Sequence, residues 1–295
     1  TIARAYTKGI LGSTPWCKLD KVKFLCPVPG YDRHFTVCEF FGIEMVNVPM
    51  DENGPDMDMV EKLVSEDASI KGIWCVPKYS NPSGYVYSDE VVKRNAYIIH
   101  HLYPENPQKL LNIVEECEKA GNPDMIYEFT STSKVTFPGA GISAMAASER
   151  NIKSIIEMMN AQIISHDKLN QLRHVKFLPT LADVEAHMTK HADIMRPKFE
   201  AVLEMLDKEL AGLGIAEWTK PLGGYFIGFD AMEGCAKKIV SMCKDAGVVM
   251  TDAGATYPYG NDPKDSNIRI APSFPETDEL IQASEIFVIC EKIAS

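Results

Sequence analysis

The segment YEFTSTSKVTFPGAGIS, residues 127–143, decides how the whole chain is interpreted. Its start is typical of a β-strand, which we predict over residues 125–129, and this strand leads into the loop STSK, residues 131–134. Hydroxyl groups beside a lysine can bind a phosphate, and a lysine sheltered from water has a lowered pKa and becomes nucleophilic. Such a string also arises by chance, so alone it fits a surface-loop lysine equally well.

Short β-rich runs alternate with helix-like segments in the first half of the chain. We predict strands over residues 23–26, 43–48, 70–76 and 125–129, and helices such as 57–65 and 107–120 between them. This alternation is typical of a parallel sheet with helices on both faces, whose functional loops lie at the carboxyl ends of the strands. The sequence therefore predicts an α/β fold with a mainly parallel central sheet, and the STSK loop is expected at its carboxyl edge.

The second half of the chain has a different pattern. Apolar residues recur at helical spacing from residue 180 to 213, which predicts one long helix or two helices kinked at Pro197. After it we predict strands over 224–229, 247–251 and 267–271, and helices over 235–246 and 276–293. The chain is therefore expected to consist of a large domain, residues 1–185, and a smaller C-terminal α+β domain, residues 186–295.

Composition narrows the classes of function. The formal net charge is -11 and the Lys and Arg residues are scattered, which predicts no nucleic-acid partner because phosphate binding needs a basic face. No apolar run reaches the roughly 20 residues that span a bilayer, so we expect no membrane association and a soluble, cytoplasmic protein. The eight cysteines form no CxxC pair and no cluster with histidine, which predicts neither a disulfide framework nor a metal site.

Two polar side chains could share one ring hydroxyl of a bound molecule. Asn81 comes just after the predicted strand 70–76, where its amide could hydrogen-bond such a hydroxyl, and the phenol of Tyr97 could do the same. An Asn-Pro turn and simple aromatic packing explain these residues as well, so both alternatives stay open.

Two further residues suit a planar, anionic ligand. Tyr31 follows the predicted strand 23–26, where its face can stack on a planar ring. Arg269 lies between two isoleucines in a predicted strand, and a guanidinium there needs an anion to pair with. That anion can be a ligand or an acidic side chain of the protein, and both possibilities stay open.

The order of these motifs resembles the class I/II aminotransferases of fold type I along nearly the whole chain. In detail it looks like the subgroup called type Ic aspartate aminotransferases, which is related to the aminotransferase-like domain of MocR-type regulators. The resemblance is carried by the phrases CPVPGYDRHF (26–35), NPSG (81–84), NAY (95–97), STSKVTFPGAG (131–141), KPLGGYF (220–226), GATYPYG (254–260) and NIRIAP (267–272). The joint match is far more specific than any one motif.

The resemblance implies pyridoxal 5'-phosphate as the cofactor, held by Lys134 as a Schiff base. Tyr31 would stack on the cofactor ring, and Asn81 and Tyr97 would bind its O3′ oxygen. Lys134 and Tyr97 are thus the expected catalytic residues. The cofactor supplies the electron sink in this chemistry, while the protein supplies orientation and electrostatics.

The resemblance also assigns the anionic groups. Ser131 and Ser133 would lie beside the cofactor phosphate, and Arg269, with Asn81, would bind the α-carboxylate of the substrate. A homodimer is implied, because a neighbouring subunit usually completes the active site in this family.

Three features depart from the family pattern. The family has an aspartate that keeps the pyridine nitrogen protonated, and it is expected where Arg94 stands. A phosphate-binding arginine is expected soon after Pro138-Gly139, and a Gly/Ser-rich phosphate cup is expected before the first helix. Residues 84–97 are also too few for a crossover and the next strand. We therefore predict missing residues between Arg94 and Asn95 and before Thr1, which an intact mass would test.

The implied reaction moves an amino group from an amino acid, expected to be aspartate, to a 2-oxo acid such as 2-oxoglutarate. The partner of the aspartate side chain stays open among Lys78, Arg33, His34 and Lys220. Two other functions also stay open: a β-lyase or decarboxylase that uses the same cofactor, and the effector domain of a MocR-type transcription regulator. Product analysis separates the first alternative, and a basic helix-turn-helix upstream would indicate the second.

Overall fold

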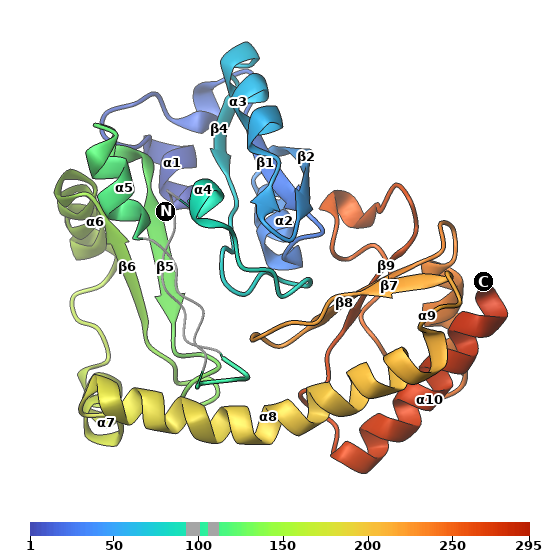
Figure 1. Ribbon diagram of the computed structural model, residues 1–295. Coiled ribbons are helices and arrows are strands. Elements are labelled where there is room, and N and C mark those ends of the chain that lie inside the picture. The colour runs from blue at the N-terminus through green and yellow to red at the C-terminus, as the bar shows by residue number, and fades with distance from the viewer. Residues whose placement is uncertain (93–100, 106–111) are drawn as a thin grey trace. The chain divides into compact units, whose positions relative to one another are not determined.

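The computed structural model describes residues 1–92, 101–105 and 112–295. The described residues form two compact units, taken one at a time below: residues 1–20, 88–92 and 112–190 make up the first, and residues 21–87, 101–105 and 191–295 the second (Figure 1). The predicted division into domains 1–185 and 186–295 stays a prediction. Tyr97 and the suspected junction of Arg94 and Asn95 lie outside the described residues.

A four-stranded sheet organises the first part of the second unit. Its strands lie in the order β3 (Gly54–Pro55), β2 (Glu44–Asp51), β1 (Lys23–Val28) and β4 (Ile70–Ile73). β1 pairs in parallel with β2 and with β4, and the short β3 is antiparallel to β2. All residues of β1 after Lys23 are buried, as suits a central parallel strand that is covered on both faces. The predicted mainly parallel sheet is confirmed for these strands.

Two helices fix the loops at the edges of this sheet. α3 (Met57–Glu66) begins at Asp56, whose carboxylate accepts a hydrogen bond from the Met59 amide at 2.9 Å, which is a usual N-cap. α2 (Asp32–Phe40) begins just after the carboxyl end of β1. Since β1 and β4 are adjacent and parallel, the loops that follow them leave the sheet at one edge. These loops contain Tyr31 and Asn81.

A three-stranded antiparallel sheet organises the rest of the second unit. β7 (Ala216–Trp218), β8 (Ile227–Ala231) and β9 (Asn267–Ile270) lie in that order, with α9 (Ala236–Asp245) and α10 (Thr277–Ala294) beside them (Figure 1). The core below this sheet includes the buried side chains of Phe199, Leu206, Ile227, Phe229 and Ile268. The predicted α+β pattern of this region is therefore present.

One alternative for this region is confirmed, and one prediction needs a correction. Of the two alternatives for residues 180–213, the single long helix is present, because α8 (Leu181–Leu210) is one helix of 30 residues with Pro197 inside it. Residues 247–251 form no strand: Gly247 has a φ of 92°, and the Val248 amide donates to the Cys243 carbonyl at 2.8 Å. The backbone that was expected to enter a sheet thus closes the end of α9 instead.

The first unit contains a two-stranded antiparallel sheet and several helices. β5 (Tyr127–Ser131) pairs with β6 (Ser143–Ala147) in antiparallel orientation, and this is the pairing of β5 among the described residues. That the strand before Lys134 belongs to the parallel sheet stays a prediction. The described helices of this unit are α1 (Ile2–Lys8), α4 (Asp89–Val92), α5 (Ile113–Lys119), α6 (Glu149–Gln162), α7 (Lys168–Phe177) and the start of α8, with short 3-10 turns at Trp16–Lys18 and Pro123–Met125.

Across the described part of the chain, none of the helices combines the length and apolarity that a membrane span requires.

Candidate functional site

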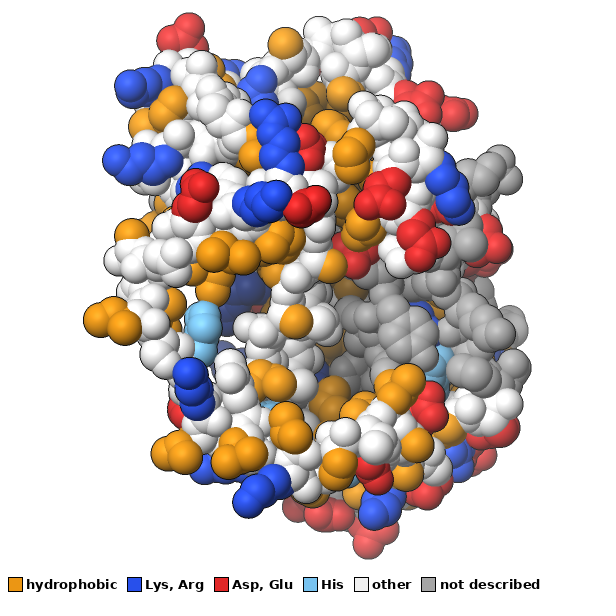
Figure 2. Space-filling view, turned by 90° about the vertical axis from the view of Figure 1, so that its left-hand side faces the viewer, with side chains coloured by type: hydrophobic (Ala, Val, Ile, Leu, Met, Phe, Trp, Pro, Cys, Tyr) orange, Lys and Arg blue, Asp and Glu red, His pale blue; other side chains and the backbone are white. Residues whose placement is uncertain are grey.

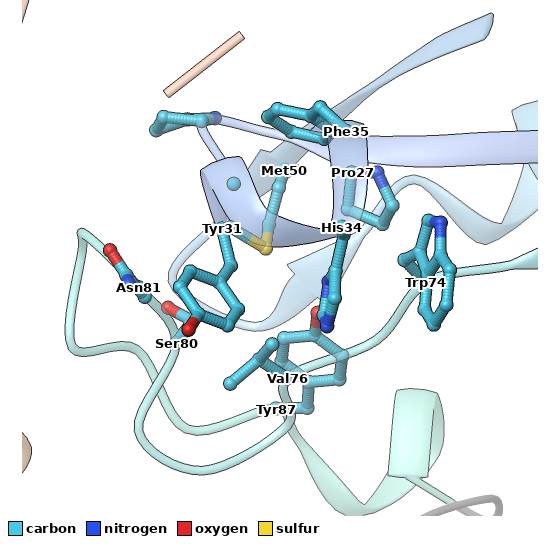
Figure 3. Close-up of a pocket in the computed structure, with 12 residues that line it drawn as sticks. Pro27, Tyr31, His34, Phe35, Met50, Trp74, Val76, Ser80, Asn81 and Tyr87 are labelled. Atoms are coloured by element: carbon cyan, nitrogen blue, oxygen red, sulfur yellow. The ribbon is translucent and has the colours of Figure 1, made fainter. Parts of the chain in front are cut away.

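A pocket in the second unit lies where the loops after β1 and β4 meet. It is lined by residues that include Tyr31, His34, Trp74, Ser80, Asn81 and Tyr87 (Figure 3). Gly30 makes the sharp entry into α2 possible, because a Cβ atom there would lie 2.5 Å from the Pro27 carbonyl oxygen. The structure thereby brings two of the predicted cofactor residues, Tyr31 and Asn81, to one pocket.

Aromatic rings form one wall of this pocket. His34 stacks on Trp74 with ring centroids 4.4 Å apart, and Tyr31 meets His34 edge-on at 5.1 Å (Figure 3). Burial lowers the pKa of His34 to about 4, although the nearby carboxylate of Asp32 acts in the opposite direction. His34 is therefore a neutral imidazole at pH 7 and does not supply a cation for a substrate carboxylate. Sequence reasoning had kept it as a candidate for that role.

The Asn81 loop is held by its own hydrogen bonds. The Ser80 amide donates to the Tyr85 carbonyl at 2.9 Å, the Gly84 amide to the Ser80 carbonyl at 2.7 Å, and the Tyr87 amide to the Pro77 carbonyl at 3.0 Å. The turn that the Asn-Pro pair predicts is thus present. It does not exhaust the role of Asn81, whose side chain reaches beyond the turn.

Arg269 joins this loop to the start of α2. Its Nη1 donates to Asn81 Oδ1 and to Asp32 Oδ1, each at 3.1 Å, and its Nη2 lies 3.4 Å from the Thr251 hydroxyl. The guanidinium lies over the Phe226 ring at 5.0 Å. The side chain is 10% exposed, and its buried Nε has no hydrogen-bond partner among the residues that the structure describes. The predicted need of Arg269 for an anion is met in part, by an acidic side chain.

The contact with Arg269 also fixes which way the Asn81 amide faces. A guanidinium can only donate hydrogen bonds, so the amide oxygen must point to Arg269. The Asn81 Nδ2 group is then left to donate in another direction, and Asn81 lines the same pocket as the Tyr31 ring. An aromatic face and an amide donor at one pocket fit a planar ring that carries a hydroxyl or oxide oxygen.

The first unit presents Ser131, Ser133 and Lys134 on an exposed turn after β5. Ser131 Oγ donates to Ser133 Oγ at 3.0 Å, and all three side chains are exposed. The turn is closed by the amides of Val135 and Thr136, which donate to the Thr132 carbonyl at 2.9 Å and 3.0 Å. The two serine hydroxyls therefore stand together, as a phosphate-binding pair requires, while Lys134 has water access.

A set of residues that sequence reasoning missed anchors this turn from behind. His174 of α7 is 5% exposed; its Nε2 lies 2.7 Å from the Thr136 hydroxyl and its Nδ1 lies 2.8 Å from the Asn170 carbonyl. Because a carbonyl only accepts, Nδ1 must carry the proton, and in the neutral ring Nε2 accepts from Thr136. His187 Nε2 also donates to the Val135 carbonyl at 2.7 Å. No pattern in the sequence linked these histidines to Lys134.

The remaining candidates for the substrate side chain can be sorted by their surroundings. Lys220 pairs with Asp207 at 2.6 Å and is more than half exposed, so it behaves as a solvated surface charge. Arg33 is exposed. Lys78 is 1% exposed, and burial lowers its pKa to about 8. Among these three, only Lys78 has an environment that differs from that of an ordinary surface cation.

Comparisons with known proteins agree on one family. The model of the family described as aspartate amino-transferase matches residues 1–295. An aspartate aminotransferase of Corynebacterium glutamicum is 43% identical over 297 residues, which cover 95% of this chain and 68% of that protein. That alignment is longer than the part of this chain that it covers, so the relative has residues within the matched region that this chain lacks.

Solved structures give the same result. The crystal structure of an aspartate transaminase from Corynebacterium glutamicum matches with a TM-score of 0.96 and 43% identity, and the match covers 99% of this chain and 73% of that one. The α-aminoadipate aminotransferase LysN of Thermus thermophilus, solved with N-(5'-phosphopyridoxyl)-L-leucine, matches with a TM-score of 0.78 at 18% identity over 93% of this chain and 72% of that one. The second match supports the fold alone, and the predicted α/β fold class is confirmed.

Proposed function

Because this chain belongs to the aspartate aminotransferase family, and is thus an aminotransferase, we propose that it binds pyridoxal 5'-phosphate and transfers the amino group of aspartate to a 2-oxo acid such as 2-oxoglutarate. The observation that carries the proposal is the state of the Arg269 guanidinium. Its side chain is 10% exposed, and within the described part of the chain one of its buried donors has no hydrogen-bond partner. A carboxylate ligand would satisfy that donor.

The residues of each unit fit the cofactor when tested separately. In the second unit, the Tyr31 ring and the Asn81 amide line one pocket, which suits a planar ring with an O3′ oxygen. In the first unit, Ser131 and Ser133 present a pair of hydroxyls next to Lys134, which suits a phosphate and a covalent anchor. We propose these residues for those roles, together with Tyr97, which lies outside the described residues.

The cofactor, when bound, supplies an electron sink for the bond that is broken at the substrate Cα. Lys134 would hold the cofactor covalently in the resting protein. Its amine, when free, would act first as the base that takes the proton from the substrate Cα and then as the acid that delivers this proton to the cofactor. Arg269 would hold the substrate α-carboxylate and so fix which Cα bond is presented for cleavage. The neutral His34 and the rings around it would keep the pocket apolar beside the Tyr31 face.

The aspartate specificity is proposed from the printed activity of the Corynebacterium relative. Lys78 is the described residue with the best claim to bind the second carboxylate, because a buried lysine favours an anionic partner. Replacing Lys78 with methionine should therefore raise KM for aspartate and 2-oxoglutarate but leave KM for alanine and pyruvate within about twofold, since the change removes only the charge that discriminates them. An equal change for both substrate pairs would remove this assignment.

The cofactor assignment has a direct test. Borohydride reduction of the protein loaded with pyridoxal phosphate should fix the cofactor to Lys134, as digestion and peptide mass analysis would show. The cofactor should then stay attached when the protein is denatured. The Lys134→Ala variant should take no label, and a matched Lys153→Ala variant, which removes an exposed lysine of α6 in the same unit, should be labelled as the wild type is. A label on another lysine would overturn the assignment of Lys134.

Product analysis tests the reaction itself. Transamination yields one 2-oxo acid for each amino acid consumed, with no ammonia and no CO2. Release of ammonia would indicate a β-lyase, and release of CO2 a decarboxylase. Either product in stoichiometric amount would replace the proposed reaction by one of those alternatives.

We also propose a homodimer in the cytoplasm. The first unit exposes apolar side chains among its charged ones, and Figure 2 shows such side chains standing out on its visible face. Ile164, Leu169, Val175 and Leu181 are each more than half exposed, as residues of a subunit interface would be in one isolated chain. None of the eight cysteines, all of which lie in the described part of the chain, forms a disulfide, which fits a reducing compartment. Light scattering after gel filtration should give twice the mass of the chain, and a monomer at micromolar concentration would refute the dimer.

A further inference from the structure

The guanidinium of Arg269 is only partly satisfied. It has five N–H donors, of which Nη1 serves Asp32 and Asn81 at 3.1 Å each, and Nη2 makes one long contact of 3.4 Å with Thr251. The Nε donor is buried, and no group in the described ranges 1–92, 101–105 and 112–295 accepts a hydrogen bond from it. Asp32 neutralises the charge through a single oxygen, Oδ1, and leaves the side of the fork formed by Nε and Nη2 without a carboxylate.

A ligand carboxylate could use this fork better than Asp32 does. Bidentate binding through two parallel N–H···O bonds is the strongest geometry between an arginine and a carboxylate. A carboxylate on the Nε and Nη2 side would satisfy the orphan donor. It would also bring a second negative charge close to Asp32, and two adjacent carboxylates on one cation repel each other.

The surroundings of the Asp32 carboxylate allow it to separate from Arg269. Its side chain is 43% exposed, so water can solvate the released carboxylate. It is also the first residue of α2, a helix of nine residues, and the positive end of a helix stabilises a carboxylate whether or not an arginine is near. Asn81, by contrast, is a neutral acceptor and has no charge to compete with a substrate.

We propose that Asp32 is an internal counterion that competes with the substrate α-carboxylate for Arg269, and that substrate binding displaces it. This inference rests on the proposed role of Arg269 in binding the substrate. It makes Asp32 a positioning residue that lowers the affinity for carboxylates while keeping the guanidinium oriented in the free protein.

The test uses the protein loaded with pyridoxal phosphate and succinate, a dicarboxylate without an amino group, in a calorimetric titration. The Asp32→Asn variant keeps the size of the side chain and an oxygen acceptor but removes the competing charge. Succinate should therefore bind about threefold to tenfold more tightly to it, as expected for the loss of a half-exposed ion pair. The Asp32→Ala variant should change the affinity in the same direction, and thermal unfolding checks that both variants are folded.

Two controls make the outcome specific. Asp58→Asn removes an exposed carboxylate from the first turn of α3, so it matches the loss of charge and of a helix-terminal acid, and it should leave succinate binding unchanged. In an Arg269→Gln background, where succinate should bind weakly, the Asp32→Asn change should have no further effect. Salt should weaken succinate binding to the wild type and to Asp58→Asn alike.

The possible failures are distinguishable. Unchanged or weaker binding to Asp32→Asn, with binding still lost in Arg269→Gln, would overturn the competition and leave the role of Arg269 intact; Asp32 would then be a clamp that holds the arginine in place. Equal binding to wild type and Arg269→Gln would instead refute the substrate role of Arg269 itself. The borohydride label on Lys134 is independent of both results.

Discussion

Replacing His174 with alanine should loosen the turn that presents Lys134. The imidazole is 5% exposed and bonds the Thr136 hydroxyl at 2.7 Å and the Asn170 carbonyl at 2.8 Å. Its ring also packs edge-on against Phe137, with centroids 5.3 Å apart. With about 1 kcal/mol for each hydrogen bond and a similar amount for the ring contact, the free energy of unfolding should fall by about 2–4 kcal/mol.

The effect on catalysis should appear in kcat. A reacting group that is displaced by about 1 Å can cost up to roughly 100-fold in rate, and the amine of Lys134 is carried by the very turn that loses its anchor. We therefore expect kcat to fall by about 10- to 100-fold, while KM for the amino acid stays within about twofold because Arg269 and Asn81 belong to the other unit. Urea unfolding gives the stability, and initial rates over a range of amino acid concentrations separate kcat from KM.

A matched control and a double-mutant cycle make this prediction refutable. His166→Ala removes an exposed histidine from the same unit and should change neither quantity. Thr136→Val removes the hydroxyl that forms a hydrogen bond with His174. The loss in free energy of unfolding of the double variant should therefore differ by about 1 kcal/mol from the sum of the two single losses. Additive losses, or a His174→Ala variant with normal kcat, would show that the hydrogen bond does not position Lys134.

Three further changes have expected outcomes. Arg269→Lys should raise KM for the amino acid and the 2-oxo acid by about 10- to 100-fold in steady-state kinetics, because an ammonium cannot bind a carboxylate through a planar fork. Burial lowers the pKa of His34 to about 4 from its ordinary 6.5, so the unfolded chain binds more protons between these values; stability should be lost as pH falls through that window, by up to roughly 3 kcal/mol. Urea unfolding at pH 7 and pH 5 should show a smaller difference for His34→Gln. Gly30→Ala would place a Cβ 2.5 Å from the Pro27 carbonyl oxygen and should cost about 1–3 kcal/mol in thermal unfolding, whereas a variant as stable as the wild type would contradict the close approach.

Local patterns predicted those elements whose apolar residues are buried at the period of the element. The run at β1 is apolar on both faces. The helical spacing from residue 181 to 210 continues through Pro197, because α8 has buried residues on both sides of that proline. A proline removes one hydrogen bond and crowds the preceding turn, yet packing of a long apolar stripe outweighs that cost here. The sequence could not decide between a kink and a continuous helix, since the deciding contacts are tertiary.

Other elements had no local signature strong enough to predict them. α7 buries one side chain, His174, and its apolar residues Leu169, Leu172 and Val175 are exposed, so no amphipathic stripe marks it. Residues 247–251 include the apolar pair Val248 and Val249 typical of a strand, but the left-handed Gly247 turns the chain back to close α9. In both cases the sequence pattern reflects only neighbouring residues. The conformation depends on the contacts of His174 in α7 and on the turn at Gly247 after α9.

Arg269 shows why the composition of a site can be predicted from sequence when its internal pairing cannot. A guanidinium between two isoleucines of a strand needs an anion on physical grounds alone, so the residue could be singled out as functional. Its partner Asp32 is 237 residues away in the chain, and no spacing rule connects them. Desolvation gives such a cation a preference for any carboxylate, but only the geometry shows that Asp32 reaches one nitrogen while Nε stays unsatisfied. A side chain that fully satisfied the arginine would have made a structural ion pair; one that satisfies it in part leaves a site at which a substrate carboxylate can compete.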